Sequence, residues 1–301
     1  MTAIPQNQES FDLLDRRVAR AWDELISLSS EFSEEDHRRW LFRGLGRSCW
    51  SLCSTLDRAL ERFGVSSAEA YLWELRLTRE FQRHAGRFTS TPPADDIVAW
   101  LGLMQHHGAP TRLLDWTYSF WVAVFFAIRD ASPGDECAIW AMNTAWFAPR
   151  IHEKYPGTAK ALRRFDPNAL RPLFDPDRAE PFIAVLAPYE LNERLAIQQG
   201  TFVTAADIRR SFMENLTATA TGAESEMRAN LLKICVPCSQ EFLRATLSQL
   251  HRMNVNETTL FPGGIDGFSR DLRTRVSIPE LFHGVNGNLW SHMVQGSDLS
   301  A

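Results

Sequence analysis

The segment from Met104 to Thr117 carries the densest set of side chains that could do chemistry. It reads MQHHGAPTRLLDWT and combines amide, imidazole, hydroxyl, guanidinium and carboxylate groups. A histidine titrates near neutral pH, so His106 or His107 could act as an acid or a base, and Asp115 could orient a reacting group. The segment precedes the most apolar stretch of the chain. Apolar walls with a few converging polar groups are typical of ligand sites.

A structural role would explain the same residues. Asp115 or Thr117 could cap the helix that follows, and the histidines could satisfy the end of the helix that precedes them. Arg112 could pair with Asp115, although alternation along an extended segment places these two side chains on opposite faces unless the chain bends. Both interpretations stay open at the level of sequence.

A second segment, Phe42-Arg43-Gly44, ends a short run of bulky apolar residues that predicts a strand. An arginine next to a core is costly to bury unless it is paired or binds an anion. The glycine allows backbone or ligand to approach closely. Arg43 could therefore contact a ligand or form a buried ion pair with Asp115 or Glu80.

The elements that must position these residues follow from hydrophobic periodicity. Helical spacing predicts helices over 10–31, Ser66 to Phe88, Asp95 or Asp96 to His107, Tyr118 to Ala131, 239–253 and 268–276. Short apolar runs predict strands at Trp40–Gly44, Ala138–Met142, Phe182–Ala187, Leu195–Ile197, Thr201–Thr204 and Leu231–Val236. We expect an α+β fold, its helical N-terminal half packed on a mixed or split sheet. We expect one domain over 1–301, with a proline-rich surface excursion at 148–178.

Composition argues against several classes of protein. The net charge of −5 opposes a basic nucleic-acid-binding surface. No stretch reaches the ~20 apolar residues of a membrane span, and no secretory signal is evident. Five cysteines fit a reducing compartment, so we expect a cytoplasmic protein. Cys49 with Cys53 and Cys235 with Cys238 could supply zinc thiolates, but their apolar surroundings favour buried free thiols, and we predict no metal site.

Both polar segments resemble the FRG domain family. The resemblance covers roughly residues 15–275. It rests on Phe42-Arg43-Gly44, Trp50-Ser51-Leu52 with Leu56, Gln105–Thr117, Phe126-Ala127, and the later segments Arg194–Phe202 and Thr258–Pro262. The sequence departs from the family pattern at Leu45, where a polar residue is expected, and at Cys53, where proline is usual. The family name describes a motif, so the resemblance implies kinship and leaves the reaction open.

A weaker similarity to arginine-type ADP-ribosyltransferases suggests a chemistry. In those enzymes a strand ending in Arg-Gly holds NAD, a Ser/Thr-containing strand runs into an apolar helix, and a third strand carries a catalytic glutamate. Arg43-Gly44, Thr111–Thr117 and Glu193–Phe202 follow this order. Arg194 stands where the glutamate is expected, and Glu193 on a strand would point away from a site lined by residue 194.

These resemblances imply a nucleotide-like ligand, with NAD as candidate substrate, in a toxin-type or defence-type transferase. The catalytic or orienting residues would be His106, His107, Asp115, Thr117 and Gln199. The ligand-binding residues would be Phe42, Arg43, Gly44, Gln105, Thr111, Arg112 and Trp116, with the two arginines on phosphate or ribose and Trp116 stacking on a ring. The alternative is a non-catalytic interaction module, of unknown protein partner, in which both motifs form a structural polar network. The absence of a glutamate near Arg194 favours this alternative.

Overall fold

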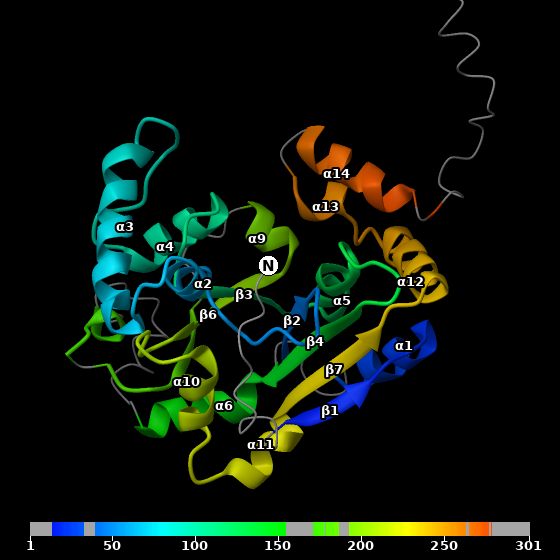
Figure 1. The fold of residues 1–301 in the computed structure, drawn as a ribbon, viewed down its shortest axis with the longest axis horizontal. Helices are drawn as coiled ribbons and strands as arrows, with labels where there is room; N and C mark the ends of the chain where they lie inside the picture. Colours follow the sequence, from blue (N-terminus) through cyan, green and yellow to red (C-terminus); the bar gives the residue numbers. More distant parts are fainter. Residues whose placement is uncertain are drawn as a thin grey trace, which may run out of the picture.

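The computed structural model describes residues 14–32, 40–154, 171–177, 179–186, 193–262, 265–276 and 278. Within them, seven strands form one mixed sheet in the order β1-β7-β4-β2-β3-β6-β5 (Figure 1). The strands are β1 (Asp15–Val18), β2 (Trp40–Leu45), β3 (Leu113–Thr117), β4 (Glu136–Asn143), β5 (Ile183–Leu186), β6 (Gly200–Ala205) and β7 (Leu231–Pro237). β1 runs parallel to β7, and the other neighbouring strands are antiparallel.

Helices cover both faces of this sheet, which confirms the α+β expectation (Figure 1). One face packs against α1 (Trp22–Glu31), α5 (Phe120–Ile128) and α12 (Gln240–Arg252), and further along against α4 (Ile97–His106) and α9 (Glu193–Ile197). The other face packs against α2 (Thr55–Arg62), α6 (Thr144–Lys154), α10 (Phe212–Thr219) and α11 (Glu224–Asn230). The remaining helices are α3 (Ala70–Ala85), α13 (Glu257–Leu260), α14 (Ile265–Arg275) and the short 3-10 turns Ser67–Glu69 and Arg171–Phe174.

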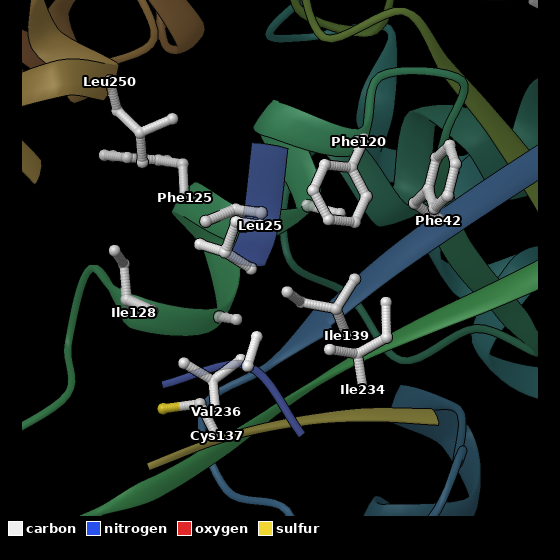
Figure 2. Packing of buried hydrophobic residues seen from close by; sticks show 14 of the residues in the cluster. Leu25, Phe42, Phe120, Phe125, Ile128, Cys137, Ile139, Ile234, Val236 and Leu250 are labelled. Atoms are coloured by element: carbon white, nitrogen blue, oxygen red, sulfur yellow. The ribbon is translucent and has the colours of Figure 1, made fainter. Parts of the chain in front are cut away.

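Helix α5 is the central buried helix that its apolar sequence predicts. Its residues pack on the strand residues of one sheet face, among them Phe42, Ile139 and Ile234 (Figure 2). The rings of Phe42 and Phe120 lie 5.4 Å apart in an edge-on arrangement. Side chains alternate between the two faces along each strand. Phe42 of β2 therefore lies on the face that packs against α5, and the adjacent residues Leu41 and Arg43 lie on the other face.

Two segments differ from the sequence expectation. Residues 195–197 lie in helix α9 rather than in a strand, and 15–18 form strand β1 rather than the start of a helix. β1 is an edge strand that pairs with β7 from Asp15 to Val18. Such short segments take their structure from neighbours that local periodicity does not reveal. Part of the expected surface excursion at 148–178 lies outside the described residues, but its Leu173 is buried in a core cluster.

The pairing between neighbouring strands is shortest between β2 and β3. β2 pairs with β4 along its whole length, from Trp40 to Leu45, but its register with β3 consists of Phe42 opposite Thr117. Beyond that pair, the Arg43 side chain reaches across and its Nη1 donates a hydrogen bond to the carbonyl oxygen of Asp115. The Phe42–Gly44 segment and the Gln105–Thr117 segment therefore meet where the strand pairing in the sheet is shortest.

Candidate functional site

Asp115 is an exposed carboxylate on an otherwise buried central strand. Leu113, Leu114, Trp116 and Thr117 are each buried, whereas Asp115 reaches solvent. Odd-numbered residues of β3 face the side of the sheet that α4, α5 and α9 cover. A solvated carboxylate at such a position is unusual, because central strands normally place apolar side chains there.

The Asp115 carboxylate is held by Gln105 at the end of α4. Gln105 Nε2 donates to Asp115 Oδ2 at 3.0 Å and to the carbonyl of Leu113 at 3.3 Å. The orientation of the Gln105 amide is fixed in turn, because Thr111 Oγ1 donates to its Oε1 while accepting from the N–H of Leu113. The Gln105 and Thr111 side chains therefore position Asp115 rather than remaining free for a ligand.

Replacing Thr111 by valine tests this network. The isosteric change removes the donor to Gln105 Oε1 and the acceptor for the Leu113 N–H at a fully buried position. We expect the free energy of unfolding to fall by about 1–3 kcal/mol, since buried polar partners are left unsatisfied. Urea unfolding measures the loss. The exposed Thr91→Val is the control and should stay within about 0.5 kcal/mol of wild type; an equal loss in both variants would contradict the network.

His106 and Arg194 lie close to Asp115 on the same side of the sheet. Arg194, at the start of α9, is partly buried and makes no hydrogen bond or ion pair with the described residues. Burial lowers the pKa of Arg194, Asp115 opposes this shift, and neighbouring arginines add to it. The exposed His106 has a lowered pKa, chiefly through partial desolvation and then through His107 and Arg194. A carboxylate, an imidazole and a cation thus converge at one solvent-accessible place.

Three arginines, Arg194 among them, lie around the ring of Phe261. The guanidinium carbons of Arg194, Arg270 and Arg129 lie 4.5, 5.1 and 5.3 Å from the centroid of that ring. Arg129 also donates to the buried Glu257 at 3.0 Å. Burial raises the pKa of Glu257, which the arginines counteract. Three guanidiniums around one aromatic ring give this side of the molecule a local positive potential.

The structure corrects the expectation for Arg112. Its guanidinium is fully buried and makes a bidentate ion pair with Glu74 of α3, and it also donates to the carbonyl of Leu173. It lies between the rings of Tyr71 and Phe174, 5.1 and 4.6 Å from their centroids. With its donors engaged by protein acceptors, Arg112 is unavailable to a ligand and does not pair with Asp115.

The structure also corrects the expected contacts of Phe42 and Gly44 with a ligand and the expected stacking of Trp116 on a ligand ring. Phe42 packs against Phe120 in the core, and Trp116 is 2% exposed within the cluster on the opposite face of the sheet. A Cβ on Gly44 would collide with the carbonyl oxygen of Ala123, so α5 occupies the space that a ligand would need. Phe42 and Gly44 are part of the packing between β2 and α5, whereas Trp116 packs in the core on the other face.

The remaining expected catalytic residues separate into buried and exposed positions. Thr117 is buried, and its Oγ1 donates to the carbonyl of Gln198 at 2.7 Å while accepting from the N–H of Ser119. It is therefore a capping residue rather than a catalytic one. Gln199 is exposed, has a positive φ of 48° and forms the turn into β6. His107 is exposed, with its ring 6.5 Å from that of Phe81.

Arg194 was noted in the sequence as a departure from a glutamate, not as a ligand-binding residue. Phe261 lies in Thr258–Pro262, one of the segments that resemble the FRG domain family, but it was not predicted as a site residue, and Arg129 and Arg270 belong to no motif. Their proximity depends on α9, α13 and α14, which lie far apart in sequence from α5. Arginines spaced this widely give no local signal that they share one ring.

The cysteines and a groove along α3 lie apart from this site. Cys137 and Cys238 are buried and their sulfurs lie 3.5 Å apart; within the described ranges, no group of three histidines, cysteines or acids has a metal-binding arrangement. A groove of about 490 Å³ follows α3 and is lined by Tyr71, Leu72, Leu75, Phe174 and their neighbours. It is mostly apolar and borders the Arg112–Glu74 pair, so it does not lie at Asp115. No described helix has the length and apolar character to cross a membrane.

Comparison with protein families identifies the part of the chain that holds both motifs. Residues 38–136 match the family model of the FRG domain. This part of the chain is similar to the FRG domain. The matched range contains β2, β3 and α5, the Gln105–Thr111–Asp115 network and the Arg112–Glu74 pair. Arg194, Phe261 and Arg270 lie outside the matched range. Comparison with curated proteins and with solved structures found no match.

Proposed function

We propose that this FRG-domain protein binds a nucleotide-like ligand of the NAD type beside Asp115. One observation carries the proposal. Arg194 is a partly buried cation without a hydrogen-bonding or ion-pairing partner among the described residues, and it faces a carboxylate that Gln105 holds in place. Burying an arginine this way is unfavourable unless an anion completes the site.

The groups at this place match the parts of such a ligand. Arg194 supplies donors and a positive charge for a diphosphate. Asp115 can accept hydrogen bonds from ribose hydroxyls. His106, mostly neutral at pH 7 because its pKa is lowered, can accept or donate a proton. Arg43 contributes indirectly, since it donates to the backbone carbonyl of Asp115.

A transferase activity would follow from the same arrangement. When nicotinamide leaves NAD, the bond to the ribose carbon breaks and positive charge develops on the ribose, which a nearby carboxylate stabilises. Asp115 is the exposed carboxylate at the site, and α9 presents Arg194 instead of a glutamate. An incoming nucleophile would take the place of nicotinamide and lose its proton to His106 or to water.

Calorimetric titration with NAD and with ADP-ribose tests the proposal. We expect saturable binding that weakens about tenfold or more in Asp115→Asn and in Arg194→Gln, because each removes a charge-assisted hydrogen bond. Glu193→Gln, an exposed neighbour on the same helix, is the control and should bind as wild type does. Release of nicotinamide is then assayed with the wild type and with Asp115→Asn. Absence of binding by a folded wild-type protein would overturn the proposal.

An interaction module without catalysis is the second candidate. The Arg112–Glu74 pair favours it, because one central residue of the motif is fully used in holding α3 and the 3-10 turn at Arg171–Phe174 against β3. The Thr117 and Gly44 contacts are likewise structural. A folded protein that binds neither NAD nor ADP-ribose would make this function the better one.

A further inference from the structure

Three buried N–H donors on the face of the sheet opposite Asp115 have no acceptor among the residues that the structure describes. They are Nε of Arg43 and the indole Nε1 atoms of Trp116 and Trp140. Trp116 is 2% exposed and Trp140 1% exposed. Buried side-chain donors in native proteins almost always have a partner, and each one left alone costs about 1–3 kcal/mol. Three of them close together call for a common explanation.

The sheet register shows that the three side chains are neighbours. Arg43 on β2 is the direct partner of Trp140 on β4. Pairing of Phe42 with Thr117 sets Trp116 on β3 next to Arg43 on the other side. Cross-strand neighbours on one face have Cβ atoms about 4.5–5.5 Å apart. The three side chains thus form a row across three adjacent strands, on the face of the sheet that packs against α2.

The charge around this row is positive. Arg43 makes no ion pair with the described residues; its recorded hydrogen bond goes to a backbone carbonyl. Lys233 on β7, the register partner of Trp140, places its Nζ 5.3 Å from the Trp140 ring centroid. Burial lowers the pKa of both Arg43 and Lys233. Asp115 opposes the shift at Arg43 and Arg58 adds to it, and Cys235 and Glu136 oppose the shift at Lys233. Arg43 is therefore held here at a cost in free energy that an anion would relieve.

The three N–H donors and the positive charge of Arg43 indicate the chemistry of a partner. Such a partner must offer acceptors and a negative charge. An apolar group would leave all three N–H groups unsatisfied, and a cation would be repelled. A water molecule accepts at most two hydrogen bonds and brings no charge. An oxyanion has several acceptor oxygens and a negative charge, and Arg43 is suited to such a group.

We propose that this row of donors binds a small oxyanion group of the phosphate type, with its oxygens accepting from Arg43 Nε, Trp116 Nε1 and Trp140 Nε1. The site lies on the opposite face of the sheet from Asp115. The two sites share Arg43, whose Nη1 donates to the carbonyl oxygen of Asp115, but their other proposed contacts are different residues, so the tests of the two sites can give different results.

Indole N–H resonances of the full chain, labelled with 15N, report directly on this site. The chain has ten tryptophans, and Trp116→Phe and Trp140→Phe assign the two signals of interest. We expect inorganic phosphate, added at constant ionic strength against chloride, to shift these two signals in a saturable way. Trp73, whose indole N–H already has an acceptor in Glu69, is the internal control and should not move.

Variants separate a built site from nonspecific effects of salt. Arg43→Lys keeps the charge but removes Nε, and it should weaken phosphate binding about tenfold. Glu193→Gln, an exposed change on α9 on the other face, should leave the shifts unchanged. If ADP-ribose but not free phosphate moves both signals in wild type and in Asp115→Asn, the oxyanion is the phosphate of a larger ligand and the proposal holds. If neither compound moves them, or if Trp73 moves in parallel, the proposal is overturned and the row is hydrated.

Discussion

Gly44→Ala is expected to destabilise the protein strongly. The added Cβ would collide with the carbonyl oxygen of Ala123 and lie 2.5 Å from the backbone N of Ala127. Both atoms belong to the backbone of α5, so no side chain can rotate away, and the helix must move off the sheet. We expect a loss of about 3 kcal/mol or more, seen as a melting temperature lowered by about 10 °C or as failure to fold.

Gly46→Ala is the matched control for this prediction. Gly46 follows directly after β2, and a Cβ there would meet a side-chain carbon of Trp50 at 3.7 Å, an ordinary contact. Thermal unfolding followed by circular dichroism should show Gly46→Ala within about 2 °C of wild type. Similar melting temperatures for the two variants would contradict the claim that the glycine of the Phe-Arg-Gly motif serves the packing of α5.

Arg112→Met is the second substitution with a large expected effect. It keeps apolar volume between the rings of Tyr71 and Phe174 but leaves the buried carboxylate of Glu74 without its cation. Breaking a buried ion pair from one side costs about 3–5 kcal/mol. We expect this loss in the free energy of unfolding measured in urea, with ligand binding at Asp115 unaffected at temperatures where the variant is folded.

A double variant distinguishes an unpaired charge from lost packing. Arg112→Met with Glu74→Leu removes both charges and should recover most of the stability, because replacement of a buried pair by apolar residues is often neutral. Glu80→Gln breaks the exposed Arg83–Glu80 pair on the same helix and should change stability by less than about 1 kcal/mol. A double variant as unstable as Arg112→Met alone would show that packing, and not charge, makes Arg112 necessary.

These predictions divide the two motifs into residues that build the fold and residues that can meet a ligand. Gly44, Phe42, Arg112 and Thr117 contact other parts of the protein, and Gln105 with Thr111 orients a neighbour. Asp115, His106 and His107 reach solvent. Most residues of the two motifs therefore hold the fold together or orient a neighbour, and only a few reach solvent. A binding site needs such supporting contacts to keep its accessible groups in place.

The sequence by itself determined the strongly periodic elements and where the polar groups concentrate. The apolar helix at Phe120–Ile128, the strands at Trp40–Leu45 and Leu231–Pro237, and the helix stop at Gly108, with its φ of 80°, all follow from local patterns. The resemblance of residues 42–44 and 105–117 to the FRG domain is likewise legible in the residues alone, because a run of this kind is specific regardless of fold.

Tertiary structure decided which polar residue points where. Alternation along β3 separates Asp115 from Arg112, but only the position of α3 shows that Glu74 is the partner of Arg112, 38 residues away. The convergence of Arg129, Arg194 and Arg270 on Phe261 arises from helices distant in sequence. Residues 195–197 became helical despite a strand-like pattern. Partners and faces depend on which elements pack together, and hydrophobic periodicity carries no information about that choice.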